Sequence, residues 1–360
     1  MPERMVRSLY EVFQAIPDPR EARGRRHPLS AILTGVVLAL VAGQNSLRQI
    51  AGWLQGLDWT TRQRLGCRRG KVPSLETIRR VLQGVDVVVL AQEIQAWVEE
   101  VMALGKPSAP WLGIAVDGKV LRGSGDEAVP ALQVLNALVH QMGAMLLSHP
   151  IPPGSNELGV VQEVLEGLVL EGRVVTLDAL FTQKGVAEAI LKKGGHYVMR
   201  VKGNQPELLR SLELWFTGAP PLTRAETLEW EGETRGHGRW VRYRIRTTAV
   251  LNAYLREELG WPGIGQAFCI EREEVQEKAG ERKVSVHYGI TDLSLQEAPP
   301  WRLLGLWRRH WEVENKGHWV LDTVFQEDRS RARTRTLPLE RVMNFPGVAG
   351  LWRAAGRQRR

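Results

Sequence analysis

Ionisable and aromatic side chains are concentrated in one short segment near the end of the chain, from Trp307 to Trp319. Its thirteen residues include two acids, two histidines and three tryptophans. If the segment is an α-helix, one stripe about 100° wide carries most of these groups. The members of the stripe are Trp307, His310, Trp311, Glu314, His318 and Leu321. Glu312 would point almost the opposite way, so Glu314 is the glutamate on the face that could carry chemistry.

Two aspartates earlier in the chain each stand at the end of an apolar run. Asp117 follows residues 112–116, and Asp178 follows residues 173–177. Side chains at the carboxyl ends of strands line the site in α/β proteins, whereas a single aspartate in such a place is more often a turn or helix cap. With Glu314, the aspartates make a set of three carboxylates, and such oxygen ligands suit Mg²⁺ or Mn²⁺. A pair of these ions can promote phosphoryl transfer.

Positive charge is concentrated at the C-terminal end of the chain. The net charge is +8, and residues 329–360 contain nine arginines and one acid, so the first 328 residues are neutral overall. A neutral body with a basic end indicates a polyanionic partner such as nucleic acid, and a solvated tail is the alternative. A second basic cluster, from Arg20 to His27, adds weight to the nucleic-acid hypothesis.

Cysteine usage and hydropathy favour a protein of the reducing cytoplasm. The two cysteines, Cys67 and Cys269, match no disulfide framework and no metal-ligand spacing. The longest apolar run, residues 31–43, is too short to cross a bilayer. We therefore expect no membrane association.

The periodicity of the chain changes twice. Residues 1–105 are helical in pattern, and Ser74 before an apolar run marks one helix start; such a basic helical region suits DNA binding, although helical bundles have many uses. Residues 106–214 follow the order strand, strand, strand, helix, strand, helix, strand, which predicts a mixed sheet with flanking helices. Residues 215–300 contain long alternating segments and predict a β-rich insertion. Residues 301–360 complete the core with the Glu314 helix and a basic C-terminal helix.

Several motifs occur in a fixed order from about residue 7 to residue 350. They are AIPDPREARGRRHPLSAIL, SLRQIAGW, VPSLETIRRVL, AVDGKVLRG, SNEL, VTLDALFTQKG, YVMRVKGNQ, HGR and RRHWEVENKGHWVLDTVFQEDRSR. Each is weak alone, but together they are specific. The chain resembles the DDE transposases of bacterial insertion sequences, and most closely the H-repeat-associated branch of the insertion-sequence-4-like group.

This resemblance implies a fold, a site and a reaction. The fold is a mixed α/β, ribonuclease H-like catalytic core, with the β-rich segment inserted between the second aspartate and the glutamate. The implied active-site triad is Asp117, Asp178 and Glu314. The implied reaction is hydrolysis at the transposon ends, after which the freed 3′-hydroxyl attacks target DNA; it requires Mg²⁺, with Mn²⁺ as a substitute, and no organic cofactor. The implied partner is double-stranded DNA, both terminal repeats and target, bound by a homodimer in the bacterial cytoplasm at the nucleoid.

Further polar side chains are candidates for DNA contacts. They are Lys119, Lys202, Asn204, Arg239, His310, His318, Arg329 and Arg331. Some of them have structural alternatives: residues 202–205 could form a plain strand-to-helix turn, residues 237–239 a hairpin, and a histidine such as His318 is more often a hydrogen-bonded core residue. Core packing is also the favoured role of the tryptophans.

Three other functions stay open. The wider group carries a lysine where this chain has Leu321, which favours a catalytically inactive relic that only binds DNA, whereas the intact triad argues against it. A metal-dependent nuclease without joining activity is the alternative among enzymes. A helical interaction protein without a nucleic-acid partner is the alternative outside both classes.

Overall fold

A computed structural model describes most of the chain and divides it into two compact units. The described residues are 7–44, 46–67, 70–104, 112–121, 131–140, 144–152, 154–218, 226–236, 238–276, 281–311 and 313–318. The first unit comprises Met1–Pro110, Gly118–Val160 and Val313–Arg360, and the second comprises Trp111–Asp117 and Val161–Glu312. Within the described ranges, we find no helix long and apolar enough to cross a membrane.

Six α-helices begin the first unit. They are α1 (Leu9–Gln14), α2 (Leu29–Val41), α3 (Leu47–Gly56), α4 (Trp59–Arg64), α5 (Leu75–Gly84) and α6 (Val87–Leu104). Four start at a side chain that accepts a hydrogen bond from the backbone N–H three residues later, which satisfies an otherwise unpaired donor. These caps are Ser8, Ser46, Asp58 and Ser74. The helix start predicted at Ser74 is thus confirmed. Helix α2 is buried over most of its length and contacts α1, α3 and α5.

The first unit also contains an antiparallel hairpin and a short helical turn. Strands β2 (Leu132–Val139) and β3 (Ala144–Ile151) pair with a bulge between Ala137 and Leu138. The turn is η6 (Val313–His318), a π-helical segment that contacts β2.

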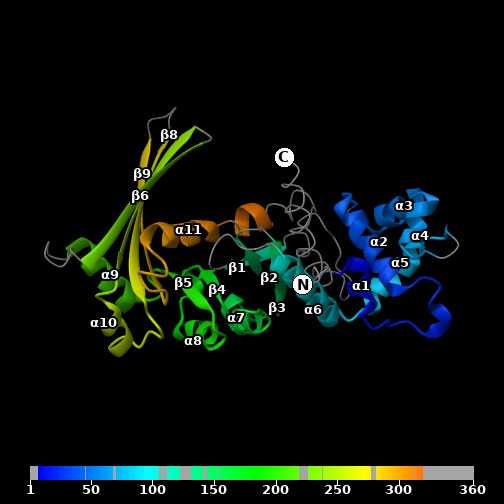
Figure 1. Cartoon of the computed structure of the whole chain (residues 1–360), viewed down its shortest axis with the longest axis horizontal. Coiled ribbons are helices and arrows are strands. Elements are labelled where there is room, and N and C mark those ends of the chain that lie inside the picture. The colour runs from blue at the N-terminus through cyan, green and yellow to red at the C-terminus, as the bar shows by residue number, and fades with distance from the viewer. Residues whose placement is uncertain are drawn as a thin grey trace. The chain divides into compact units, whose positions relative to one another are not determined.

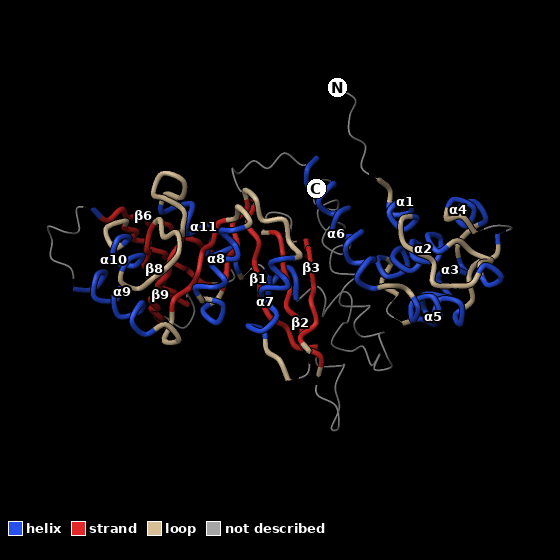
Figure 2. Tube along the Cα trace, turned by 90° about the horizontal axis from the view of Figure 1, so that it is seen from below, coloured by secondary structure: helices blue, strands red, loops and turns tan. Residues whose placement is uncertain are grey.

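The second unit is built on a long sheet with helices on both faces. Its strands are β1 (Leu112–Leu121), whose last four residues belong to the first unit, β4 (Arg173–Leu177), β5 (His196–Val201), β6 (Thr227–Gly236), β7 (Arg239–Thr248), β8 (Gln266–Gln276) and β9 (Arg282–Thr291). Helix α11 (Pro300–His310) packs on one face, where Leu303 joins Tyr243 and Ile245 in an apolar cluster. Helix α9 (Pro206–Gly218) packs on the other face, against β8 and β9 (Figure 1 and Figure 2).

The strand order confirms the predicted fold class. Hydrogen-bonded neighbours follow the order β3-β2-β1-β4-β5-β9-β8-β7-β6. The part β3-β2-β1-β4-β5, with β1, β4 and β5 parallel, has the order of a ribonuclease H-like core in a mixed α/β fold. Strand β9 pairs antiparallel with β5, so the four strands of residues 227–291 continue the core sheet rather than forming a separate one.

Strands β6 to β9 extend beyond the helices as a ribbon whose side chains there are mainly charged. Figure 1 shows their free ends extending past α9 and α10 (Asn252–Glu257). Every residue of β6 is exposed or half-buried, and its glutamates face arginines of β7, as in the ion pairs of Glu231 with Arg242 and Arg244. Cross-strand charge pairs therefore contribute to the pairing of the ribbon where little apolar surface is buried.

Two details of the predicted elements are wrong. The predicted strand end at Asp117 is not observed, because β1 continues to Leu121. The predicted single helix from Trp307 is interrupted: α11 ends at His310 and the π-helical turn η6 begins at Val313. The rest of that predicted helix, residues 319–331, lies outside the described residues. The two halves of the sequence stripe therefore belong to two different elements.

A lysine caps the C-terminal end of helix α7 (Glu157–Glu166). The Nζ atom of Lys193 donates to the carbonyl oxygens of Leu165, Glu166 and Leu168 at 2.9, 2.6 and 2.6 Å. Carbonyls at the end of a helix lack their usual donors four residues later, although that of Leu165 also accepts from the backbone N–H of Leu168 at 3.3 Å. A cation there also interacts favourably with the negative end of the helix dipole. We expect Lys193→Met to lower the free energy of unfolding by about 2 kcal/mol, measured by urea unfolding. Lys192→Met, at an exposed neighbouring position, is the matched control; an equal loss in both variants would contradict this role.

Candidate functional site

Asp117 and Asp178 take equivalent positions on neighbouring parallel strands. Val116 of β1 is opposite Leu177 of β4, so each aspartate is the next residue along its strand. Asp178 keeps an extended backbone (φ −74°, ψ 170°) although β4 ends before it. Neighbouring strands are about 4.8 Å apart, and residues in register share a face. The register therefore places the two aspartates side by side.

Asp178 lies between two cationic side chains of β5 and the turn that follows it. Its carboxylate is 3.4 Å from Nη1 of Arg200 and 3.3 Å from Nζ of Lys202. Burial acts to raise the pKa of Asp178, but the backbone N–H of Ala179 and the charges of Lys202 and Arg200 outweigh burial, so the pKa is lowered. Asp178 is therefore ionised at neutral pH, as a metal ligand must be.

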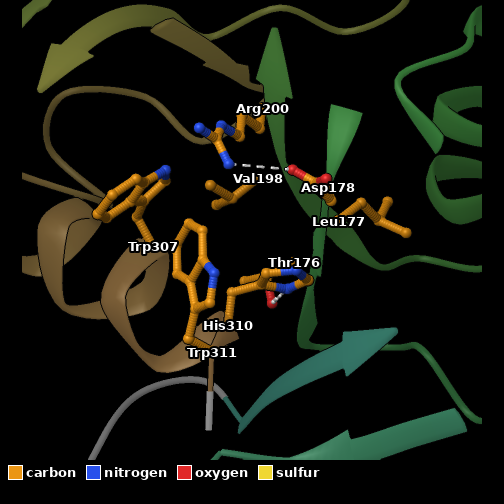
Figure 3. Close-up of a pocket in the computed structure, with 8 residues that line it drawn as sticks. All are labelled: Thr176, Leu177, Asp178, Val198, Arg200, Trp307, His310 and Trp311. Carbon is orange, nitrogen blue, oxygen red and sulfur yellow. Dashed lines mark hydrogen bonds and ion pairs between the residues drawn. The ribbon is translucent and has the colours of Figure 1, made fainter. Parts of the chain in front are cut away.

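A small pocket opens beside Asp178, between β4, β5 and α11 (Figure 3). It is lined by Thr176, Leu177, Asp178, Val198, Arg200, Trp307, His310 and Trp311. His310 is 7% exposed, and its Nδ1 lies 3.1 Å from Oγ1 of Thr176. Burial lowers the pKa of His310 to about 4, so its ring is neutral at pH 7. It supports the wall of the pocket and does not offer a positive charge to DNA.

Arg200 is the best-anchored cation of this site. Besides its contact with Asp178, its Nη2 donates to Nδ1 of His287 at 2.9 Å. Its guanidinium also lies 5.7 Å from the ring centroid of Trp311, a cation–π contact. Trp311 packs in turn on Trp307, with ring centroids 4.5 Å apart. Arg200 is not among the residues predicted from the sequence, where its signal is a single arginine inside the otherwise apolar strand YVMRV.

The turn after β5 carries two of the predicted DNA-contact residues, Lys202 and Asn204. Lys202 is about half exposed and points at Asp178. Asn204 donates through Nδ2 to the carbonyl oxygen of Ala179 at 2.7 Å. The backbone beside Asp178 is therefore fixed by Asn204, which gives this side chain a structural role. Farther along the sheet, Arg239 at the start of β7 forms an ion pair with Glu274 at 3.2 Å.

Glu314 lies in the first unit, on the turn η6. It is exposed, whereas His318 on the same turn is half-buried. Nδ2 of the fully buried Asn136 donates to Nε2 of His318 at 3.0 Å, and Oγ of Ser148 donates to Oδ1 of Asn136. Burial, and then the charge of Lys119, lower the pKa of His318 to about 4. This hydrogen-bonded chain from β3 through β2 fixes η6, and it gives His318 a positioning role.

The structure thus gathers the predicted residues into two groups. Asp117, Asp178, Lys202 and Asn204 belong to the second unit, and Lys119, Glu314 and His318 to the first. Arg329 and Arg331 lie outside the described residues. Among the described ranges, no three His, Cys, Asp or Glu side chains are close enough together to hold a metal ion. The aspartate pair nevertheless offers two oxygen-donor groups of the kind that a hard divalent cation prefers.

Comparison with known proteins gives matches along most of the chain. Residues 10–98 match a family described as DDE_Tnp_1-associated, and residues 112–337 match the family described as Transposase DDE domain. The chain is 28% identical over 334 residues to "Putative transposase YncI" of Escherichia coli O157:H7, covering 91% of this chain and 83% of that protein. It is also 28% identical over 335 residues to "H repeat-associated putative transposase YhhI" of Escherichia coli strain K12, covering 91% and 85%.

Among solved structures, one match is a cryo-EM structure of the piggyBac transposase synaptic complex with hairpin DNA. The TM-score is 0.40 and the sequence identity 10%, over 97% of this chain and 70% of that chain.

Proposed function

The chain belongs to the DDE transposases, in their H-repeat-associated branch, and on this premise we propose that it cuts DNA at the ends of its own element and joins the freed 3′-hydroxyl to target DNA. The observation that carries the proposal is the register of β1 and β4, which sets Asp117 beside Asp178. Two carboxylates at the same level of adjacent parallel strands are an arrangement suited to phosphoryl transfer.

We assign the metal ligands to Asp117, Asp178 and Glu314. A bound Mg²⁺, or Mn²⁺ in its place, supplies a Lewis acid that stabilises charge on the phosphate oxygens. The two aspartates offer adjacent oxygen donors, and Asp178 is held ionised by Ala179, Lys202 and Arg200. Glu314 is exposed on a turn that the hydrogen bond between Asn136 and His318 holds in place. Its carboxylate is therefore available as the third metal ligand.

The cations near Asp178 are assigned to the DNA backbone. Lys202 is exposed and Arg200 is half-buried, and a phosphodiester approaching Asp178 would meet both of them. Arg239, Arg329 and Arg331 stay proposed contacts for the flanking duplex, whereas Lys119 is only 8% exposed and is not proposed as one. His310 and His318 are given supporting roles, because both rings are neutral at pH 7. We also propose a homodimer on DNA in the bacterial cytoplasm, since two ends must be joined.

The test uses purified protein and DNA that carries the gene with its native flanks. The DNA is incubated with Mg²⁺ or Mn²⁺, and new 3′-hydroxyl ends are mapped for the wild type and for Glu314→Gln. We expect cuts at the element boundaries that are absent in the variant, followed by joined products.

Each other outcome has a distinct meaning. Boundary cuts without joined products would support the nuclease alternative. Specific binding without cuts would support the inactive relic. Equal cleavage by Glu314→Gln would remove Glu314 from the triad.

A further inference from the structure

We propose that helix α5 reads base sequence in double-stranded DNA, with Arg79, Arg80 and Gln83 contacting base edges in the major groove. This inference rests on the proposed function, because it assigns the recognition of the element's DNA to one helix of the first unit. The site is separate from the three carboxylates and needs no metal ion.

The outer face of α5 consists of long polar side chains. Glu76, Arg79, Arg80 and Gln83 follow the spacing of one helical face and span about 100° at 100° per residue. The first three are exposed and Gln83 is half-buried. The opposite face is apolar, and its Ile78 and Val81 are fully buried. An arginine pairs well with guanine and a glutamine with adenine in the major groove, so the types on this face suit base recognition.

Packing in the first unit presents that face outward. Helix α5 contacts α3 and, to a smaller extent, α2, and Figure 1 shows these helices gathered in one bundle. Helices α2 and α3 approach closely at Gly35, where a Cβ would lie 2.9 Å from Leu54. Helix-turn-helix proteins place a recognition helix in the major groove in a similar way. There, as for α5 here, the exposed helix is packed on other helices of a small bundle.

The connection into α5 is held firmly. The guanidinium of Arg62 donates to the carbonyl oxygens of Gly70 and Gln55, which ties the loop before α5 to the end of α3. The ring of Trp59 lies against Gly70, where φ is +64° and a Cβ would lie 1.9 Å from the ring. Only glycine fits this position. Ser74 then caps the helix, so the direction of α5 is fixed before DNA binds, as a specific contact requires.

Charge around α5 matches a polyanionic partner. Residues 46–85 contain eight Lys and Arg against two acids, within the first 328 residues that are neutral overall. Arg48, Arg64 and Lys71, near α5 in sequence, are exposed and suit phosphate contacts. Arg79 and Arg80 pair with Glu76 at 3.4 and 3.2 Å, with arginine side chains 47% and 74% exposed. Exposed pairs of this kind are weak, so DNA can displace them.

The experiment measures binding of the full-length protein to native-flank DNA and to a scrambled duplex of equal composition. Arg79→Ala and Arg80→Ala are each expected to reduce the preference for the native flank roughly tenfold or more. Arg79→Lys keeps the charge but loses the two-pronged contact, so it should lose preference while keeping its affinity for scrambled DNA. Arg64→Ala should weaken binding to both duplexes equally, and Arg210→Ala on α9 should change neither.

Circular dichroism melting checks that each variant is folded, and two outcomes separate the proposals. If the wild type prefers and cuts the native flank but the Arg79 and Arg80 variants keep its full preference, the inference on α5 is wrong and the proposed function stands. If the wild type shows no preference for its flank, both are overturned. Loss of preference in Arg79→Lys with unchanged cleavage of a pre-bound end would support the inference in full.

Discussion

Replacing Asp178 by asparagine is expected to reduce strand cleavage about a thousandfold or more, because a ligand that supplies several kcal/mol of transition-state stabilisation through a bound cation is lost. The amide keeps the size of the side chain but not its charge. DNA binding should be kept or slightly strengthened, since Arg200 and Lys202 lose their anionic partner and become available to phosphate.

Single-turnover formation of 3′-hydroxyl ends on native-flank DNA measures the first effect, and a gel-shift titration measures the second. Mn²⁺ titration of the free protein gives an independent readout, because the variant should bind the ion more weakly. Asp58→Asn is the matched control: Asp58 is exposed and caps α4, a role that asparagine also fills. Cleavage by Asp178→Asn within tenfold of the wild type would exclude Asp178 from the metal site.

The pairing of Asp117 with Asp178 could be predicted from the sequence because each follows a short, mainly apolar run. Asp117 follows residues 112–116 and Asp178 follows residues 173–177, and a carboxylate at the end of such a run stands out without any knowledge of tertiary structure. If the two strands pair in parallel with Val116 opposite Leu177, the aspartates lie together whatever the order of the other strands. The alternation of strands and helices predicts a mixed sheet with flanking helices, whereas the strand order β3-β2-β1-β4-β5 is seen only in the structure.

Other features depend on packing that the sequence does not encode locally. The apolar spacing from Trp307 is the same for one long helix and for α11 followed by η6, so the sequence pattern does not show that α11 ends at His310. Strand β6 was not predicted, because its charged residues hide the strand signal until they pair with β7. Arg200 was missed because one arginine in a strand is usually solvent-facing, whereas here Trp311, His287 and Asp178 surround it.

Three neutral histidines, of which His310 is buried and His287 and His318 are half-buried, should make the fold sensitive to mild acid. Burial lowers the pKa of His287, His310 and His318 to about 4 in each case, against about 6.5 in the unfolded chain. Between these two values the unfolded state binds more protons, so stability is complete above pH 6.5 and falls as the pH falls toward 4. For His287 and His310, which belong to the second unit, the loss from pH 6.5 to pH 5 is about 1.5 kcal/mol each.

A total of about 3 kcal/mol is a large share of the roughly 5–15 kcal/mol that stabilises a folded domain. Carboxylates with lowered pKa values, such as Asp178, lose their contribution only below about pH 4.5, so the window from pH 6.5 to 5 isolates the histidines. Urea unfolding at pH 7.5, 6 and 5 measures the effect, and His310→Gln should be less stable at pH 7.5 but show a shallower pH dependence. An unchanged urea midpoint across this pH range would contradict the lowered pKa values of these histidines. Because the pKa of His287 in the folded protein is about 4, its ring still accepts from Arg200 at pH 5, so the same window should leave Arg200 in place at Asp178 while the fold loses stability.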